Sequence, residues 1–250
     1  MTGVHWITHQ HPPDAFPDVR DALRDPDGLL AIGGDLSMQR LLCAYKRGIF
    51  PWYSLGQPVL WWSPDPRAVL FPEDLKISRS LRKSIRRAGW RFSLDEDFAG
   101  VMERCAETPR PGQDGTWISA DMVAAYSALH EAGYAHSVEV WDGDEMVGGL
   151  YGVAIGKVFF GESMFSHATD ASKAALAALV RQLQAWDFAL IDCQVTNPHL
   201  ERLGSRNLPR EEFLGLLREH TRAPQPGQWT MELSRLGLDR FDPAVTGLQA

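Results

Sequence analysis

In the C-terminal half of the chain, hydrophobic and polar positions alternate in a pattern that predicts strands joined by short turns. The expected strands lie at 135–141, 146–155 and 158–164. The turns Asp142-Gly143-Asp144 and Gly156-Lys157 separate them, and connections this short join antiparallel neighbours. A helix capped by Asp170 or Ser172, a strand at 190–195 and a helix near 210–219 follow.

The N-terminal part has a different pattern, because Pro, Gly and Trp interrupt residues 12–67 throughout. Pro and Gly break long helices and strands, so this part indicates an irregular module built on turns. One short helix is expected there, from Asp35 or Ser37 to Gly48. Between the two parts, the pattern predicts a helix at about 78–88, a strand at 90–94 and helices near 95–106 and 119–132.

Together these elements predict an α+β protein of two domains. Residues 1–67 form a small irregular N-terminal domain. Residues 68–250 form a C-terminal domain with a mostly antiparallel sheet, whose tail is loosely ordered after about residue 222. Three antiparallel strands, a helix, a strand and a helix match the core order of the N-acetyltransferase-like (GNAT-like) fold.

Composition argues against several classes of protein. No apolar stretch approaches the roughly 20 residues of a membrane-spanning helix, and the N-terminus does not resemble a signal peptide. We therefore expect a cytoplasmic protein without a membrane partner. The three cysteines are isolated, which argues against a disulfide framework and a cysteine-based zinc site. No carboxylate or cysteine completes a ligand set with His5, His9 and His11, so no metal is expected.

Charge is unevenly distributed along the chain. The formal net charge of −7 alone argues against a nucleic-acid binder. Yet the helix expected at 78–88 and its flanks carry a run of cations without an acid, and Ile77, Leu81 and Ile85 mark one apolar face. The run is either a solvated face or a set of phosphate contacts, and the absence of compensating acids favours phosphate. The candidate contacts are Lys76, Arg79, Arg82, Lys83, Arg86 and Arg87.

The strand at 190–195 carries the clearest candidates for chemistry. Side chains two apart in a strand point the same way, so Asp192 and Gln194 should share one face. Asp is rare in strands, and a buried unpaired carboxylate is costly, so this pair indicates a site. A second acid, Glu162, interrupts another apolar run and is either functional or paired with a nearby arginine.

Long stretches in order resemble the bacterial leucyl/phenylalanyl-tRNA–protein transferases across roughly residues 14–220. They include GLLAIGGDLS at 28–37, AYKRGIFPWY at 44–53, LWWSPDPRAVL at 60–70, GTWIS at 115–119, GGLYGVAIGKVFFGESMFS at 148–166 and IDCQV at 191–195. The resemblance implies an aminoacyltransferase that moves Leu or Phe, and also Met, from tRNA to the α-amine of a protein beginning with Arg or Lys. That product is marked for degradation by the N-end rule. It also implies a monomer with a GNAT-like C-terminal domain.

The resemblance also implies roles for individual residues. Asp192 and Gln194 would be catalytic, and Glu162 and Asn197 would bind the acceptor. Adenosine of the aminoacyl-tRNA would stack on Trp52, with Tyr45, Trp117 and Tyr126 nearby, although core packing is the commoner role of any single Trp. The amino-acid pocket would be walled by Leu150, Gly161, Met164, Leu179, Leu183 and Ile191.

The chemistry of this reaction suits such residues. An aminoacyl-tRNA is an activated ester, so an amine can attack it without ATP, a metal or an acyl-enzyme, and no cofactor is expected. An α-amine has a pKa of about 7.7–8.0, so the enzyme mainly holds the amine and the ester in line. The amide of Gln194 can accept a hydrogen bond from the amine, and Asp192 can stabilise the developing ammonium charge. Whether Asp192 takes the proton directly or through Gln194 stays open.

Three rival functions explain less of the sequence. A CoA-dependent acetyltransferase needs a Gly-rich turn for pyrophosphate, and residues 166–171 contain no Gly and one acid. A glycosidase using Glu162 and Asp192 would leave the basic helix without a purpose. A non-catalytic RNA-binding module would leave the strand carboxylate unexplained.

Overall fold

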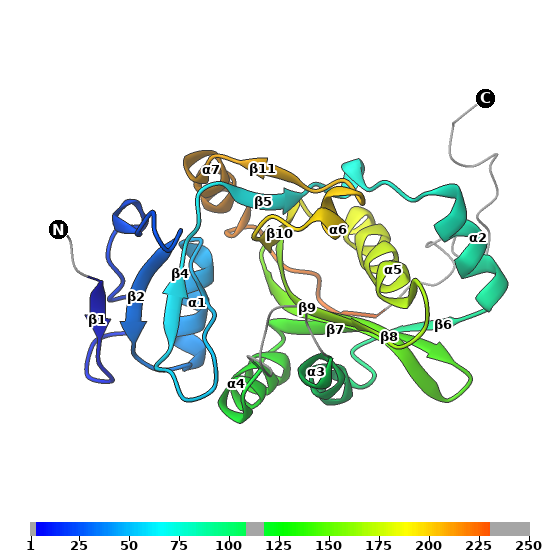
Figure 1. The fold of residues 1–250 in the computed structure, drawn as a ribbon, viewed down its shortest axis with the longest axis horizontal. Coiled ribbons are helices and arrows are strands. Elements are labelled where there is room, and N and C mark those ends of the chain that lie inside the picture. The colour runs from blue at the N-terminus through cyan, green and yellow to red at the C-terminus, as the bar shows by residue number, and fades with distance from the viewer. Residues whose placement is uncertain (1–3, 109–117, 231–250) are drawn as a thin grey trace.

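The computed structural model describes residues 4–108 and 118–230, which form a small N-terminal sheet beside a larger one (Figure 1). The larger sheet has seven strands in the order β11-β5-β10-β9-β8-β7-β6. Its strands are β5 (Arg67–Leu70), β6 (Arg91–Leu94), β7 (Ala135–Asp142), β8 (Glu145–Ile155), β9 (Val158–Ser166), β10 (Leu190–Gln194) and β11 (Arg206–Leu208).

The expected meander is confirmed, because β7, β8 and β9 pair antiparallel in sequence order. Strand β10 lies parallel to β9, and helix α5 (Ala171–Ala185) makes the crossover between them. Strand β5 pairs antiparallel with β10, although the two strands are far apart in the sequence. The fold is therefore α+β with a mostly antiparallel sheet.

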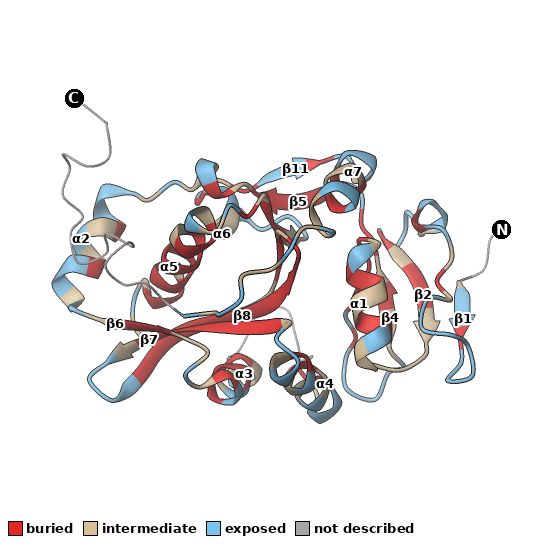
Figure 2. Cartoon of the chain, turned by 180° about the vertical axis from the view of Figure 1, so that it is seen from behind, coloured by how far each residue is buried: buried red, intermediate tan, exposed pale blue. Residues whose placement is uncertain are grey.

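Helices cover both faces of the large sheet, and Figure 2 shows the sheet and α5 largely in the buried colour. Helices α3 (Phe98–Glu107) and α4 (Ala120–Glu131) lie on one face. Helix α5 covers the other, with α2 (Arg79–Ala88) packed beside it. The remaining described helices are α1 (Met38–Lys46), α6 (Pro198–Glu201) and α7 (Arg210–His220), with short 3-10 turns η1 (Val19–Asp21) and η2 (Pro72–Asp74).

The N-terminal module is more regular than the sequence suggests. It contains a four-stranded sheet, and the strands in spatial order are β1 (His5–Ile7), β2 (Leu29–Gly33), β4 (Leu60–Trp62) and β3 (Phe50–Pro51). Pro and Gly limit these strands to a few residues each, but they do not prevent pairing. At Gly33, where φ is +89°, an added Cβ would lie 2.4 Å from the carbonyl oxygen of Ile7. Gly33 thus permits the close approach of β1.

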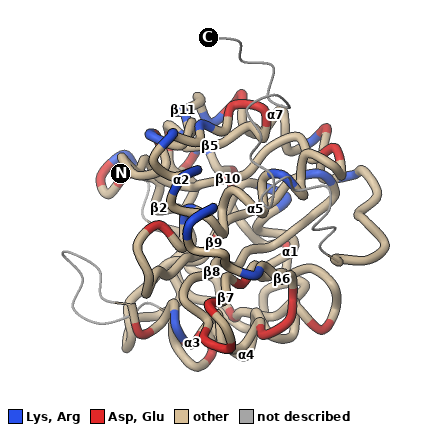
Figure 3. Tube along the Cα trace, turned by 90° about the vertical axis from the view of Figure 1, so that its right-hand side faces the viewer, with Lys and Arg blue, Asp and Glu red and all other residues tan. Residues whose placement is uncertain are grey.

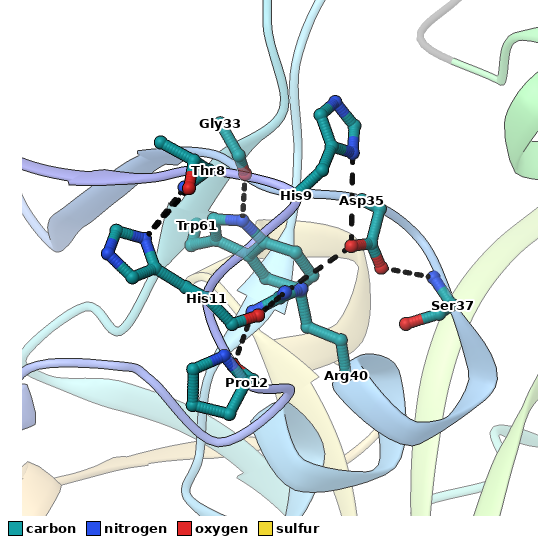
Figure 4. A network of polar contacts seen from close by, with 9 residues as sticks. All are labelled: Thr8, His9, His11, Pro12, Gly33, Asp35, Ser37, Arg40 and Trp61. Atoms are coloured by element: carbon teal, nitrogen blue, oxygen red, sulfur yellow. Dashed lines mark hydrogen bonds and ion pairs between the residues drawn. The ribbon is translucent and has the colours of Figure 1, made fainter.

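A buried arginine ties the start of the chain to this module (Figure 4). The Arg40 guanidinium donates to the carbonyl oxygens of His11 and Pro12 at 2.9 and 3.1 Å, and to Asp35 at 3.3 Å. Nearby, Trp61 Nε1 donates to the carbonyl oxygen of Gly33 at 2.8 Å. Two backbone carbonyls and one carboxylate accept from the Arg40 guanidinium, so Arg40 holds the N-terminal segment in place.

The expected boundary at residues 67 and 68 falls at the start of β5, which belongs to the large sheet. One apolar cluster continues across it, because Leu41 of α1, Trp61 of β4 and Phe160 of β9 belong to the same buried cluster. The division into two domains stays a prediction. The two sheets share a packed seam on which α1 faces α4 (Figure 1).

The described start of the C-terminal tail is packed against the large sheet. The Gln225 side chain donates to the carbonyl oxygen of Ala154 at 2.5 Å. The Trp229 ring stacks on His136 with a centroid distance of 3.6 Å, and it also contacts Trp186 and Phe188. These contacts hold Gln225 and Trp229 against the sheet, and the expected loose order of the tail after about residue 222 stays a prediction. Residues 231–250 lie outside the described part.

None of the described helices is both long enough and apolar enough to span a bilayer.

Candidate functional site

The carboxylate of Asp192 on β10 is fully buried and paired with an arginine. Arg67, the first residue of β5, donates from Nε to Oδ1 at 2.8 Å and from Nη2 to Oδ2 at 2.7 Å. Arg67 is itself only 1% exposed. Strand pairing of β5 with β10 thus supplies a two-pronged partner for the carboxylate from 125 residues away, one that was not identified from the sequence.

Arg67 is held on all sides. Its Nη1 donates to the carbonyl oxygen of Gly48 at 3.0 Å, and its guanidinium lies 4.8 and 4.7 Å from the ring centroids of Phe50 and Phe213. Such planar packing suits a guanidinium and not an ammonium group. Arg67 thus joins the end of α1, strand β3, helix α7 and the carboxylate on β10.

Gln194 ends β10 in an unusual conformation. The ladder with β5 shifts register between Asp192 and Gln194, and Gln194 has φ +57°, in the left-handed region. The two-residue alternation of an extended strand therefore does not by itself set the direction of the Gln194 side chain. The backbone N–H of Gln194 donates to Asp192 Oδ1 at 2.9 Å, which holds this turn in place.

Glu162 on β9 is joined to Gln194 and to two tyrosines. The Gln194 amide nitrogen lies 3.4 Å from Glu162 Oε1. Tyr45 of α1 donates to Oε1 at 2.7 Å, and Tyr126 of α4 donates to Oε2 at 3.2 Å. The two tyrosine hydroxyl oxygens also lie in close contact with each other, and since each hydroxyl has one proton, a bond between them replaces one of the two bonds to Glu162. These contacts replace the arginine that the alternative interpretation of Glu162 required.

The surroundings of Glu162 alter its acidity. The residue is partly exposed, but its carboxylate meets two tyrosine hydroxyls from fully buried side chains. Burial raises the pKa of Glu162 to about 7, and the hydrogen bonds from Tyr45 and Tyr126 oppose that rise. Burial, together with the charge of Glu162, also raises the pKa of both tyrosines well above 10. Glu162 therefore changes charge near neutral pH, whereas the tyrosines stay protonated.

The expected donor-side residues occupy different environments. Trp52, which follows β3, keeps 38% of its surface exposed, and its ring lies 5.8 Å from that of Trp62. Tyr45 and Tyr126 expose no surface on which a base could stack, and their hydroxyls serve Glu162. Trp117 lies outside the described residues. Among the described members of this set, Trp52 is the one with an exposed aromatic ring.

The six expected pocket residues lie around β9 and α5. The four aliphatic side chains belong to one buried apolar cluster, and Met164 packs against it partly buried. Those four are Leu150, Leu179, Leu183 and Ile191. Gly161 lies on β9, where an added Cβ would sit 3.6 Å from the carbonyl oxygen of Asp192. The structure brings the set together, and its role as a pocket stays a prediction.

The expected acceptor residue Asn197 lies three residues beyond Gln194 and is exposed. Its Oδ1 accepts from the backbone N–H of His199 at 2.8 Å, so Asn197 caps α6. The cap fixes the turn between β10 and α6. Its part in acceptor binding stays a prediction.

The basic helix is confirmed as α2, at the far end of the molecule from the N-terminal module (Figure 1). Ser78 Oγ caps it at 3.1 Å from the N–H of Leu81, and Gly89 ends it in the left-handed region. Leu81 and Ile85 are buried, so the cations point outward from the remaining faces. Exposed are Lys76, Arg79, Lys83, Arg86 and Arg87, while Arg82 is partly buried. Figure 3 shows this basic region apart from the acidic residues near α3 and α4.

Sequence reasoning missed Arg67 and the part that two tyrosines play at Glu162. One signal for Arg67 was available, because it begins the otherwise apolar run Arg67–Leu70. A fully buried arginine needs an acidic or carbonyl partner. The tyrosines gave no such signal, since each looks like an ordinary apolar position of an amphipathic helix.

Comparison with known proteins places this geometry in a family. The sequence pattern described as leucyl/phenylalanyl-tRNA protein transferase matches residues 69–218, and the pattern for the N-terminal domain of that family matches residues 34–65. The leucyl/phenylalanyl-tRNA–protein transferase of Pseudomonas fluorescens (strain SBW25) is 58% identical over 214 residues, which cover 86% of this chain and 94% of that protein. The one from Thiobacillus denitrificans is 56% identical over 218 residues, which cover 87% and 95%.

A solved structure, that of L-PGS from Bacillus licheniformis, aligns with a TM-score of 0.38 and 10% identity over 67% of this chain and 53% of that one. A likeness this slight carries no argument about the fold.

The sequence matches identify an enzyme of the aminoacyltransferase class. Within that class, the chain belongs to the leucyl/phenylalanyl-tRNA–protein transferase family.

Proposed function

We propose that the protein transfers Leu or Phe from aminoacyl-tRNA to the α-amine of proteins that begin with Arg or Lys, and that Met is a further donor. The product is a new N-terminal peptide bond that marks the acceptor for degradation by the N-end rule. The contact between Gln194 and Glu162 carries this proposal, because it sets an amide and an acid side by side at the seam of the two sheets. The protein acts as a cytoplasmic monomer with a GNAT-like catalytic domain.

The reaction is a displacement at an ester. The neutral α-amine attacks the carbonyl carbon, a C–N bond forms, and the C–O bond to the tRNA 3′ oxygen breaks. The amine loses a proton, and the released 3′ oxygen gains one, so the step needs no other reactant. Holding the amine and the ester in line is the main task of the enzyme.

Gln194 orients the incoming amine. Its amide nitrogen points to Glu162, so its amide oxygen is the group that accepts a hydrogen bond from the amine. Asp192 supports Gln194 from behind. Both of its oxygens are committed to Arg67 and to the backbone of Gln194, and the side chain is fully buried. Of the two routes that the sequence left open, this geometry argues against a proton that passes directly to Asp192.

Glu162 selects the acceptor. In its ionised form it lies where a cationic first residue or the α-ammonium group of the acceptor would meet it, and a partly desolvated carboxylate attracts such a group strongly. Asn197 borders the same side. On the donor side, Trp52 stacks on the terminal adenine, and the apolar cluster around Leu179, Leu183 and Ile191 takes the side chain of Leu or Phe.

The test is transfer of labelled Leu from Leu-tRNA to a peptide beginning with Arg, with an otherwise identical peptide beginning with Ala as the matched acceptor. We expect transfer to the Arg peptide alone, and a fall of about 100-fold in kcat for Gln194→Ala. Equal labelling of the two peptides would refute the acceptor specificity. Undiminished turnover of Gln194→Ala would refute the role of that amide.

The basic helix α2 contacts phosphates of the tRNA. Charge reversal in Arg82→Glu/Arg86→Glu should raise the KM for the donor by about 10-fold and make that KM less dependent on salt. The variant Glu103→Arg/Glu107→Arg on α3, at another edge of the molecule, is the matched control for reversed charge. An unchanged salt dependence in the α2 variant would mean that the cations of α2 face solvent and do not contact tRNA phosphates.

A further inference from the structure

We infer that Arg67 is a positioning residue of this reaction, and that it acts on Gln194 through Asp192. The inference rests on the proposed role of Gln194 and adds a buried residue that supports that role. Arg67 is 1% exposed and lies behind the carboxylate, so it touches neither substrate.

The first step is the conformation of Gln194. An L-residue other than Asn or Asp rarely adopts a positive φ, because its Cβ crowds the neighbouring backbone. Gln194 at φ +57° therefore needs a hydrogen-bond partner that stabilises this conformation. The partner is Asp192, whose Oδ1 accepts the Gln194 backbone N–H at 2.9 Å. If that carboxylate moves, the backbone of Gln194 can relax towards an extended strand, and its amide then leaves the reaction centre.

The second step is what holds the carboxylate. Asp192 Oδ1 also accepts from Arg67 Nε, and Oδ2 accepts from Arg67 Nη2, so both oxygens are fixed in one plane by the guanidinium. A lysine could neutralise the charge, but a single ammonium group cannot fix both oxygens. The role of Arg67 is thus geometric as well as electrostatic.

The third step is what holds Arg67. The carbonyl oxygen of Gly48 and the rings of Phe50 and Phe213 enclose it from three other elements. Phe50 lies two residues before Trp52, the proposed adenine platform. Groups outside β10 therefore fix Arg67, and it can hold the Asp192 carboxylate in one position.

A double-mutant cycle tests this inference. Arg67→Gln should lower kcat by about 100-fold, since a displaced catalytic group typically loses this much, while the KM for Leu-tRNA changes less than about twofold. In a Gln194→Ala background, Arg67→Gln should lower kcat by less than about twofold more, because the amide on which it acts is gone. Arg67→Lys should restore little of the lost kcat. If Arg67→Gln does not fold, Arg67→Lys takes its place in the same cycle.

Arg40→Gln is the matched control, since Arg40 is an equally buried arginine whose guanidinium holds the N-terminal segment. It should lower the unfolding midpoint but not kcat, and its effect on kcat should be the same with and without Gln194. Losses in kcat from Arg67→Gln and Gln194→Ala that multiply would overturn the inference and leave the proposed function intact. A Gln194→Ala enzyme as fast as wild type would instead overturn the proposed role of Gln194.

Discussion

Two acids at the centre of the large sheet, Asp192 and Glu162, lie on adjacent parallel strands but in opposite electrical surroundings. Asp192 meets a guanidinium that binds both of its oxygens. Glu162 meets hydroxyls and an amide, which carry no charge. A paired carboxylate is fixed in charge and position, whereas one held only by neutral donors can gain or lose a proton near neutrality. Asp192 therefore keeps its charge and position, whereas Glu162 can change its protonation state.

A third acid sharpens the comparison. Glu139 on β7 is fully buried, and it too is held by hydroxyls, those of Ser93 and Ser137. Burial raises the pKa of Glu139, as it does for Glu162. Glu139, however, has no exposed surface, while Glu162 is partly open at the seam between the sheets. An acid with neutral partners can change its protonation state, but only an acid that substrate can reach, such as Glu162, can use that change in binding.

The largest effect that separates the two acids is on stability. Asp192→Asn should destabilise the fold by about 3–5 kcal/mol, because it leaves the buried charge of Arg67 without its partner. Glu162→Gln should not destabilise the fold at pH 7 and should stabilise it, since it keeps the shape, its partners are neutral, and it removes a carboxylate whose pKa burial raises. Urea unfolding followed by tryptophan fluorescence measures both.

Asp18→Asn provides the surface control for this difference. Asp18 also binds an arginine, Arg20, but both side chains are largely exposed, so the midpoint should hardly move. Equal midpoints for Asp192→Asn and wild type would show that the Arg67 pair does not hold this strand.

A smaller effect concerns pH and activity. If ionised Glu162 binds the cationic acceptor, transfer to an Arg peptide should rise as pH passes about 7, the pKa of Glu162. The ratio of wild-type to Glu162→Gln kcat/KM removes the shared titration of the acceptor amine. That ratio should climb by about 10-fold up to roughly pH 7 and then level off. A ratio independent of pH from 5.5 to 8.5 would contradict this role.

The same group predicts how stability depends on pH. The pKa of Glu162 in the folded protein is about 7, above its ordinary value of 4.5, so folding favours the protonated acid. Its stabilising contribution is complete below about pH 4.5 and is lost as pH rises through about 7. The stability of wild type relative to Glu162→Gln should therefore fall across this window. A constant difference in urea midpoint would contradict the raised pKa.

Local spacing was enough to predict much of the fold. The meander of β7, β8 and β9 follows from alternation and short turns, and α2 follows from the four-residue apolar repeat of Ile77, Leu81 and Ile85. The N-terminal sheet could not be predicted in this way. Its strands have two to five residues, and β1 pairs in parallel with β2 across a long connection, so no short-range signal reports the pairing.

In the candidate site, too, local sequence signals predicted some residues, whereas others depend on long-range strand pairing. Asp192, Gln194 and Glu162 stand out because polar residues in apolar strands need an explanation. Arg67 could not be joined to Asp192 from sequence, since the pairing depends on which strand lies beside β10. The left-handed backbone of Gln194 is equally hidden, because Gln is not a residue type that marks such a conformation.

The smallest predicted effect tests what keeps Glu162 responsive. The hydroxyls of Tyr45 and Tyr126 both lower its pKa against the effect of burial, so removing either should raise that pKa. Tyr45→Phe should shift the rise in acceptor kcat/KM to higher pH by more than Tyr126→Phe, because its hydrogen bond is 2.7 Å long against 3.2 Å. At pH 8.5 each variant should be within about threefold of wild type, since Glu162 is ionised in all of them. A shift to lower pH in either variant would mean that the hydroxyls stabilise the protonated acid, which would contradict the role given to them here.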